Sequence, residues 1–146
     1  MHSASAPPEA SSPTTRRRME KQPSHDTRAE VRLRSILHRR GLRFRKHVRI
    51  LSDVRREHDI VFGPSKVVVE VHGCWWHGCE VHYRPPKENA SWWDAKVQRN
   101  RVRDGDTRAR LEAAGWEVVT VWEHDDLEES AARIERLVLH RRCQAT

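Results

Sequence analysis

Residues 59–72 read Asp-Ile-Val-Phe-Gly-Pro-Ser-Lys-Val-Val-Val-Glu-Val-His, and this stretch decides the fold. Apolar runs rich in valine stand on both sides of the turn residues Gly63-Pro64-Ser65, which is the composition of a β-hairpin. If Phe62 and Val67 close the turn, the pairing of every later residue along the two strands follows from that register. The sequence therefore predicts two antiparallel strands joined at this turn.

The open end of the predicted hairpin carries polar residues. In this register Asp59 lies opposite Glu70, and opposed residues share one face with their Cβ atoms about 5 Å apart. His72 shares the face of Glu70, because alternate residues of a strand point the same way. Two carboxylates at that separation suit Mg²⁺, and the imidazole can accept a proton from a metal-activated water. The arrangement resembles that of restriction-endonuclease-like nucleases, whose second strand carries an acid-x-Lys triplet, here Glu70-Val71-His72.

A cluster of metal-binding residue types follows directly, because residues 72–82 read His-Gly-Cys-Trp-Trp-His-Gly-Cys-Glu-Val-His. Cys74, Cys79 and His82 offer three zinc ligands from one short loop. We expect the fourth to be His124, which lies just beyond a predicted strand whose end can meet this loop. Spacing alone leaves three further candidates open: Cys143, His72 and His77.

The flanking sequence predicts an α/β domain with a mixed central sheet flanked by helices. A capping box at Thr27-Arg28-Ala29-Glu30 opens the first helix, and Gly41 ends it. The elements expected after it are a strand within residues 44–50, the hairpin, a helix over 91–114 that Gly105 can interrupt, a strand over 116–122, and a helix from about residue 125. This order assigns the domain to residues 25–140, between a disordered basic tail at 1–24 and a short tail at 141–146.

The composition narrows the class of protein. The chain has 146 residues, with 28 Lys and Arg against 21 Asp and Glu and a net charge of +7. A basic surface favours polyanions, since its cations neutralise phosphates and release counterions. The odd number of cysteines argues against a disulfide framework, and neither a spanning apolar run nor a secretory signal is visible. We expect a cytoplasmic monomer that does not enter a membrane.

Tryptophan is frequent, with six residues, and four of them form the adjacent pairs Trp75-Trp76 and Trp92-Trp93. Exposed indoles beside a cationic surface suit stacking on bases or insertion between them. Packing in the core is the commoner role for any single tryptophan. Taken together, carboxylates, thiolates, imidazoles and paired indoles indicate a metal-dependent enzyme that acts on nucleic acid.

The chain resembles the very-short-patch repair (Vsr) endonucleases from Asp26 to Leu139. The motifs that carry the resemblance are Asp26-Thr27-x-x-Glu30, Gly41-Leu42-Arg43-Phe44, Asp59-Ile60-Val61-Phe62, residues 72–78, Trp93-x₂-Lys96-x₃-Asn100-x₃-Asp104 and Gly115-Trp116-x₅-Trp122-Glu123. The resemblance implies a restriction-endonuclease-like fold and a Mg²⁺-dependent, strand-specific enzyme. Such an enzyme nicks DNA on the 5′ side of the thymine in a T·G mismatch left by deamination of 5-methylcytosine. It also implies a link to a cytosine methyltransferase and to a mismatch-repair protein.

The resemblance also assigns roles by position. Asp59 matches the catalytic Mg²⁺ ligand, His72 and His77 match catalytic histidines, and Glu30 matches an acid near the site. The backbone carbonyl of Val71 matches a further metal ligand. The residues that match the DNA-contacting positions are Trp75, Trp76, Trp93 and Asn100.

Several positions depart from the family pattern. Glu70 stands where an apolar residue is usual and can add a carboxylate to the metal site. His58 replaces the proline that usually precedes the aspartate. In the zinc set, Cys79 and His82 replace a His/Cys pair, and His124 replaces a cysteine, which still leaves two thiolates and two imidazoles.

Three hypotheses follow. The first is a Mg²⁺-dependent T·G nickase with a structural Zn²⁺. The second keeps the fold and the metals but acts on another mismatch, a modified base or a restriction-type site. The third is a zinc-stabilised DNA-binding module without catalysis, which the polar patch of Asp59, Glu70 and His72 disfavours.

Overall fold

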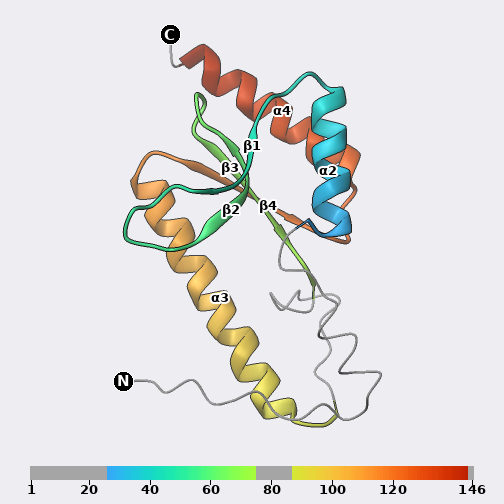
Figure 1. The fold of residues 1–146 in the computed structure, drawn as a ribbon, viewed down its shortest axis with the longest axis vertical. Coiled ribbons are helices and arrows are strands. Elements are labelled where there is room, and N and C mark those ends of the chain that lie inside the picture. Colours follow the sequence, from blue (N-terminus) through green and yellow to red (C-terminus); the bar gives the residue numbers. More distant parts are fainter. Residues whose placement is uncertain (1–25, 75–86, 145–146) are drawn as a thin grey trace.

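The computed structural model describes residues 26–74 and 87–144, and Figure 1 shows their arrangement. The described part contains one four-stranded sheet in the order β1-β2-β3-β4. Its strands are β1 (Arg45–Arg49), β2 (Glu57–Phe62), β3 (Val67–His72) and β4 (Glu117–Trp122). The pairs β1–β2 and β2–β3 are antiparallel, whereas β3–β4 is parallel. The prediction of a mixed sheet is confirmed.

The hairpin has the predicted register. Phe62 pairs with Val67, and the ladder continues to Ile60 and Val69. Phe62, Val67 and Val69 are buried together on one face of the sheet, while Val68 belongs to a separate cluster. This alternation follows from the twofold period of a strand.

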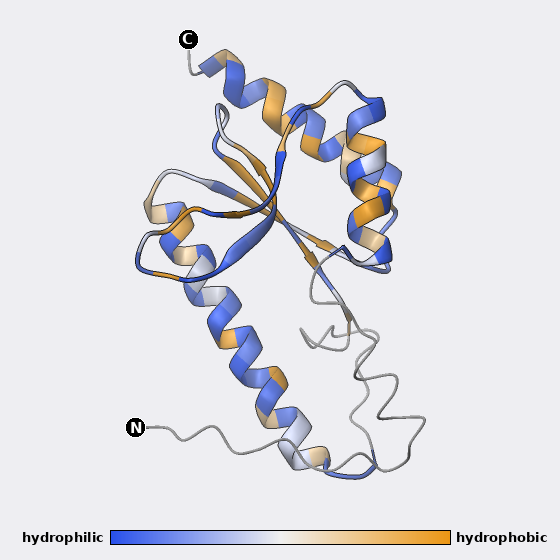
Figure 2. Ribbon diagram, viewed as in Figure 1, coloured by the Kyte–Doolittle hydropathy of each residue, from blue (hydrophilic) through white to orange (hydrophobic). Residues whose placement is uncertain are grey.

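Helices α2 (Arg28–Arg39) and α4 (Leu127–Gln144) cover the first of these faces side by side, as Figure 1 shows. The predicted N-cap at Thr27 is confirmed, because the Glu30 amide donates to Thr27 Oγ1 at 3.3 Å. The Glu30 carboxylate accepts from the Asp26 amide and not from that of Thr27, so only half of the capping box forms. Apolar residues at helical spacing point from both helices into the core, and Figure 2 shows their apolar stripes. The buried residues of the two helices in this core are Leu33, Ile36, Leu37, Leu127, Ala131, Ile134 and Val138.

Helix α3 (Ala90–Ala113) packs on the other face of the sheet with only its C-terminal part, and its N-terminal part extends away from the sheet in Figure 1. Leu111 forms a small core there with Val68 and Val118. Gly105 does not interrupt the helix. Gly115, with φ of +90°, follows its end and allows the chain to turn directly into β4.

The limits of the domain differ in part from the prediction. Helix α4 continues to Gln144, so residues 141–144 are helical, although the sequence suggested a tail from residue 141. The predicted tail at 1–24 and residues 145–146 lie outside the described residues. Among the described helices, none has the length and apolar character needed to cross a membrane.

Candidate active site

Asp59 of β2 lies just beyond the last β2–β3 pair and is half-buried. Its Oδ2 accepts a hydrogen bond from the Val71 amide at 2.7 Å, so the carboxylate takes the place of a main-chain ladder partner. Burial raises the pKa of Asp59 to about 8, and the negative charges of Glu70 and Glu30 add to this rise. Three carboxylates from α2, β2 and β3 therefore act on one another at this end of the sheet.

Glu30 is 2% exposed at the first turn of α2. Its Oε2 accepts hydrogen bonds from the Asp26 amide at 3.1 Å and from Arg34 at 3.4 Å. Burial raises the pKa of Glu30. Glu30 does form part of the predicted capping motif, and it also faces the group of acids around Asp59.

Asp26 and His47 join Glu30 in a group whose potential ligand atoms lie within 4.8 Å of one another. His47 Nε2 is 3.2 Å from Asp26 Oδ1, and Arg34 donates to the same oxygen at 2.6 Å. These hydrogen bonds lower the pKa of Asp26. The neighbouring Arg34 already supplies positive charge, so this group has the character of an ion-pair network. The sequence carries no signal that identifies His47, because its φ of +53° and its position beside α2 leave no trace in the local pattern.

Glu70 is held by the side chain of His58, for which the sequence predicts no contact. His58 is 1% exposed, and its Nδ1 donates a hydrogen bond to Glu70 Oε1. No hydrogen bond to the other oxygen, Oε2, is found within residues 26–74 and 87–144. One oxygen of Glu70 is therefore fixed by the protein, and the side chain remains partly exposed.

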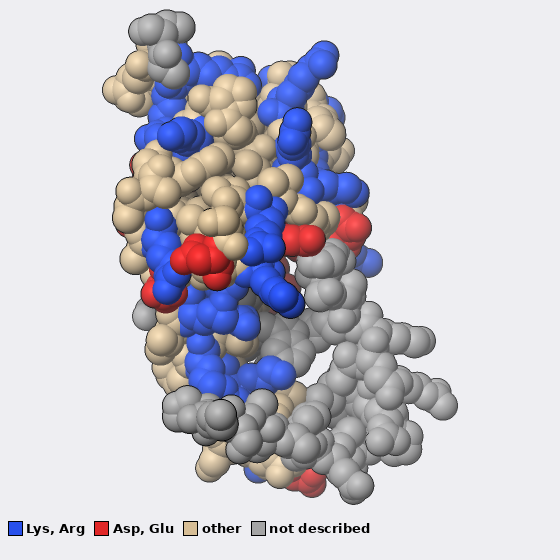
Figure 3. Space-filling view, turned by 60° about the vertical axis from the view of Figure 1, so that its left-hand side comes forward, with Lys and Arg blue, Asp and Glu red and all other residues tan. Residues whose placement is uncertain are grey.

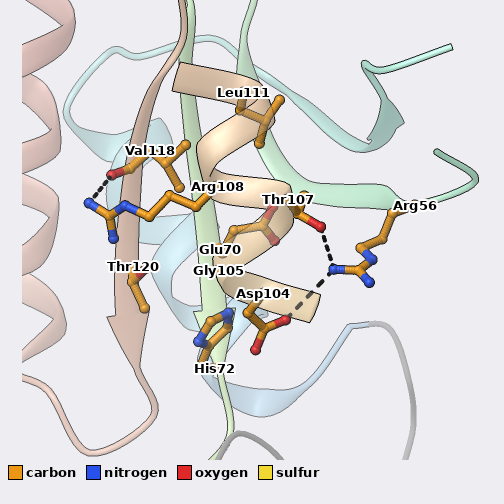
Figure 4. Close-up of a pocket in the computed structure, with 10 residues that line it drawn as sticks. All are labelled: Arg56, Glu70, His72, Asp104, Gly105, Thr107, Arg108, Leu111, Val118 and Thr120. Atoms are coloured by element: carbon orange, nitrogen blue, oxygen red, sulfur yellow. Dashed lines mark hydrogen bonds and ion pairs between the residues drawn. The ribbon is translucent and has the colours of Figure 1, made fainter. Parts of the chain in front are cut away.

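Glu70 and His72 line a cavity of about 220 Å³ between β3, β4 and α3, shown in Figure 4. The predicted shared face of these two residues is confirmed. The predicted pairing of Asp59 with Glu70 on this face is not found, because the β2–β3 ladder ends at Ile60 and Val69. Asp59 does not line the cavity; it accepts a hydrogen bond from the Val71 amide and lies near Glu30 of α2. The His72 ring packs edge-on against Trp122 with 5.2 Å between centroids, which restricts its orientation.

The cavity wall on α3 contains residues whose roles the sequence did not reveal. Arg56 donates to Thr107 Oγ1 at 2.6 Å and lies 3.8 Å from Asp104 Oδ1. Both contacts are drawn in Figure 4 and tie the start of β2 to α3. Asp104 belongs to the Trp-Lys-Asn-Asp motif quoted above, but no local signal connects it to Arg56, because 47 or more residues separate Arg56 from its partners on α3.

Cys74 and His124 come together at the ends of the two parallel strands. Residue His72 pairs with Trp122, so the chain leaves β3 and β4 at the same edge. Cys74 Sγ lies 3.0 Å from His124 Nδ1, and the Cys74 amide donates to Glu123 at 2.9 Å. Cys143 is exposed near the end of α4.

The remaining predicted residues divide into two groups. Trp93 is buried on α3, so its insertion into DNA would require the indole to leave its packed position. Asn100 is half-buried on the same helix and accepts a hydrogen bond from Arg103 at 3.2 Å. The predicted residues outside the described part of the chain are Trp75, Trp76, His77, Cys79 and His82.

Basic side chains gather on the face that includes α3, as Figure 3 shows, with some acidic side chains between them. The exposed arginines of this helix are Arg99, Arg101, Arg103, Arg108 and Arg110. Some are paired, since Arg110 contacts Asp53 at 2.7 Å and Asp106 at 3.0 Å. A basic face beside the carboxylate site suits the phosphates of a nucleic acid.

The chain is similar to known DNA endonucleases. The family model described as DNA mismatch endonuclease Vsr matches residues 10–83. The chain is 40% identical over 116 residues to the type II nicking enzyme V.NaeI of Lentzea aerocolonigenes, covering 78% of this chain and 70% of that protein. It is 40% identical over 119 residues to the type II nicking enzyme V.XorIIP of Xanthomonas oryzae pv. oryzae, covering 79% and 85%.

Two further proteins extend the comparison. The DNA mismatch endonuclease Vsr of Escherichia coli K12 is 34% identical over 101 residues, covering 68% of this chain and 63% of that protein. The catalytic domain of the homing endonuclease I-Bth0305I is similar in structure, with a TM-score of 0.52 and 17% identity, over 80% of this chain and 98% of that domain. At that identity the structural likeness concerns the fold alone. The chain therefore belongs to the family of Vsr DNA mismatch endonucleases and is an endodeoxyribonuclease.

Proposed function

We propose that this endonuclease nicks one strand of duplex DNA on the 5′ side of the thymine in a T·G mismatch, and that it requires Mg²⁺. The observation that carries the proposal is the Asp59 carboxylate, which is half-buried beside two further acids. Neighbouring carboxylates that are partly removed from water favour protonation or a cation that neutralises them. Membership of the Vsr family supports the mismatch as the substrate.

Asp59 and Glu70 would hold the Mg²⁺, with the backbone carbonyl of Val71 as a further ligand. Hard carboxylate and carbonyl oxygens are the ligands that this ion prefers. When bound, the ion polarises the scissile phosphate and lowers the pKa of an attacking water. The Val71 amide fixes the Asp59 carboxylate through its 2.7 Å hydrogen bond, so the side chain needs little reorganisation to bind.

His72 would accept the proton of the attacking water, and His77 would act on the charge of the phosphate. The His72 imidazole borders the cavity beside Glu70 and is oriented by Trp122, so it is placed to accept a proton from water near the carboxylates. We assign His77 to the charge on the phosphate, by the resemblance alone. Glu30 would add negative charge beside Asp59 and strengthen its preference for a cation, in addition to capping α2.

A structural zinc ion would join the ends of β3 and β4 through Cys74, Cys79, His82 and His124. The approach of Cys74 to His124 supports this set. With Zn–S of about 2.3 Å and Zn–N of about 2.0 Å, ligand atoms in a tetrahedral site lie roughly 3.5 Å apart. The observed 3.0 Å between Sγ and Nδ1 would need to widen by only about 0.5 Å.

A second candidate function keeps the same chemistry and changes the DNA that is cut. It is favoured by the names of V.NaeI and V.XorIIP, which are described as type II nicking enzymes. Under this alternative the chain nicks another mismatch, a modified base or a restriction-type site. In both cases Trp75 and Trp76, with Trp93 if it moves, would enter the duplex beside the lesion.

Substrate ranking separates the two candidates. Purified protein with Mg²⁺ is incubated with end-labelled duplexes of one sequence that carry T·G, G·G, 5-methylcytosine opposite guanine, or no lesion. The T·G proposal predicts cutting of the thymine strand at least tenfold faster than any other strand in the set. Faster cutting of another duplex would contradict it and support the alternative, and binding without any cutting would contradict both.

A further inference from the structure

Two titratable residues at the Asp59 end of the sheet are in direct contact. His58 directly precedes Asp59 on β2, and Glu70 lies on the neighbouring strand β3. In the structure His58 Nδ1 donates to Glu70 Oε1. His58 supplies the donor and Glu70 the acceptor, so this contact depends on both residues.

The two side chains of this contact differ in burial. His58 is 1% exposed, whereas the Glu70 side chain is 20% exposed at the wall of the cavity. A buried imidazole needs a hydrogen-bond partner, and Glu70 provides it. In return, the imidazole fixes one carboxylate oxygen and leaves the other directed away from that bond. A carboxylate held in this way loses less side-chain entropy when it binds a cation.

We propose that His58 is a positioning residue that holds Glu70 as a side-chain ligand for the catalytic metal ion. The proposal rests on the metal site proposed for Asp59, Glu70 and Val71. It adds that the site of this chain has a second carboxylate arm whose orientation depends on His58. His58 itself contacts neither the metal nor the DNA.

Metal affinity without DNA tests this directly. Binding of Mn²⁺ to the full chain is measured by the loss of the free-ion EPR signal, for wild type and for His58→Leu, His58→Asn and Glu70→Ala. Removing an outer partner of a metal ligand typically weakens affinity by about 10- to 100-fold. We expect a loss of at least about tenfold in His58→Leu and in Glu70→Ala, and near-wild-type affinity in His58→Asn, whose amide can donate in place of Nδ1.

The double variant His58→Leu/Glu70→Ala should bind Mn²⁺ no more weakly than Glu70→Ala alone, because the two residues act through one ligand. His140→Ala, an exposed histidine of α4, is the matched control and should bind as wild type does. Circular dichroism of the metal-free proteins identifies variants that fail to fold. If His58→Leu fails to fold, the folded His58→Asn and His58→Gln variants replace it. Nδ1 and Nε2 are mimicked by Asn and Gln respectively, so only Asn should preserve affinity.

Equal Mn²⁺ affinity in all folded His58 variants would overturn the positioning role, and unchanged affinity in Glu70→Ala would overturn the second carboxylate arm. Failure of the proposed function is recognised separately. It would appear as a different ranking of DNA duplexes, which leaves this pattern of Mn²⁺ affinities unchanged. If Asp59→Asn binds Mn²⁺ as tightly as wild type does, the metal site proposed for Asp59, Glu70 and Val71 is wrong.

Discussion

In the absence of a cation, two influences act in opposite directions on the pKa of Asp59. Its carboxylate is held by the Val71 amide, which favours the charged form, yet burial and the charges of Glu70 and Glu30 favour the neutral form. The second influence is larger, because the pKa rises from 3.8 to about 8. A divalent cation would remove the penalty that the neighbouring acids impose and would therefore favour the charged form of Asp59.

The raised pKa of Asp59 predicts how stability depends on pH. The folded protein retains a proton that the unfolded chain releases near pH 4, so the free energy of unfolding of the metal-free protein falls as pH rises from about 4 to about 8. Asp59→Asn removes this contribution. We expect the variant to unfold like wild type near pH 4 but to be more stable by about 1 to 3 kcal/mol at pH 8.

Urea unfolding with EDTA at both pH values measures this difference. Added Mg²⁺ should then stabilise wild type at pH 8 and leave Asp59→Asn unchanged. A variant that is less stable than wild type at pH 8 without metal would show that Asp59 contributes through its hydrogen bond and not through charge repulsion.

At the scale of elements, the helix α3 serves both the fold and the candidate site. Its C-terminal part packs on the sheet through Leu111, and residues one to two turns earlier contact Arg56 and line the cavity. Its exposed arginines, from Arg99 to Arg110, contribute to the basic face. We infer that the packing at Leu111 keeps that face in a set position relative to Glu70 and His72.

Leu111→Ala should therefore destabilise the protein by about 2 to 5 kcal/mol, because it leaves a void against Val68 and Val118. The matched control on the same helix is Val102→Ala, since Val102 is 72% exposed and should change stability by less than about 0.5 kcal/mol. Denaturant unfolding of the three proteins measures both values. Equal stability of the two variants would mean that α3 does not depend on this contact.

The ends of β3 and β4 supply a second prediction at this scale. If zinc joins them, His124→Ala should lose stoichiometric zinc and unfold at a lower temperature, because the metal stabilises only the folded chain. Metal analysis and thermal unfolding give the two results, with His140→Ala as the control. Full zinc content in His124→Ala would remove this residue from the ligand set.

Local pattern was sufficient to predict most elements. The turn at Gly63-Pro64-Ser65 and the alternation of valines identify the hairpin register, and the capping box identifies the start of α2. The contact of Cys74 with His124 follows from strands that end at one edge. Contacts between distant residues were not predictable in this way. Arg56 with Thr107 depends on tertiary packing of α3, and His58 with Glu70 lies beyond the last regular pair of the ladder.

At the scale of the whole molecule, the sheet separates the larger hydrophobic core from the cavity of the candidate site. The α2 and α4 side contains the larger core, and the α3 side contains the cavity with Glu70 and His72. Asp59 lies where the acids of α2 and β3 meet, at the end of the sheet from which the Cys74 loop also leaves. One end of the molecule thus brings together the proposed Mg²⁺ ligands Asp59 and Glu70 and two of the proposed zinc ligands, Cys74 and His124.

The central claim is that this end is a Mg²⁺-dependent site that cuts one strand beside a mismatch. Its most direct test is to map the cleaved bond at nucleotide resolution on a T·G duplex labelled on each strand, with wild type and Asp59→Asn, in Mg²⁺ and in EDTA. The account predicts one nick, 5′ to the mismatched thymine, only with wild type and Mg²⁺, and at least about a thousandfold slower with Asp59→Asn. Cutting of both strands, cutting in EDTA, or wild-type cutting by Asp59→Asn would contradict it.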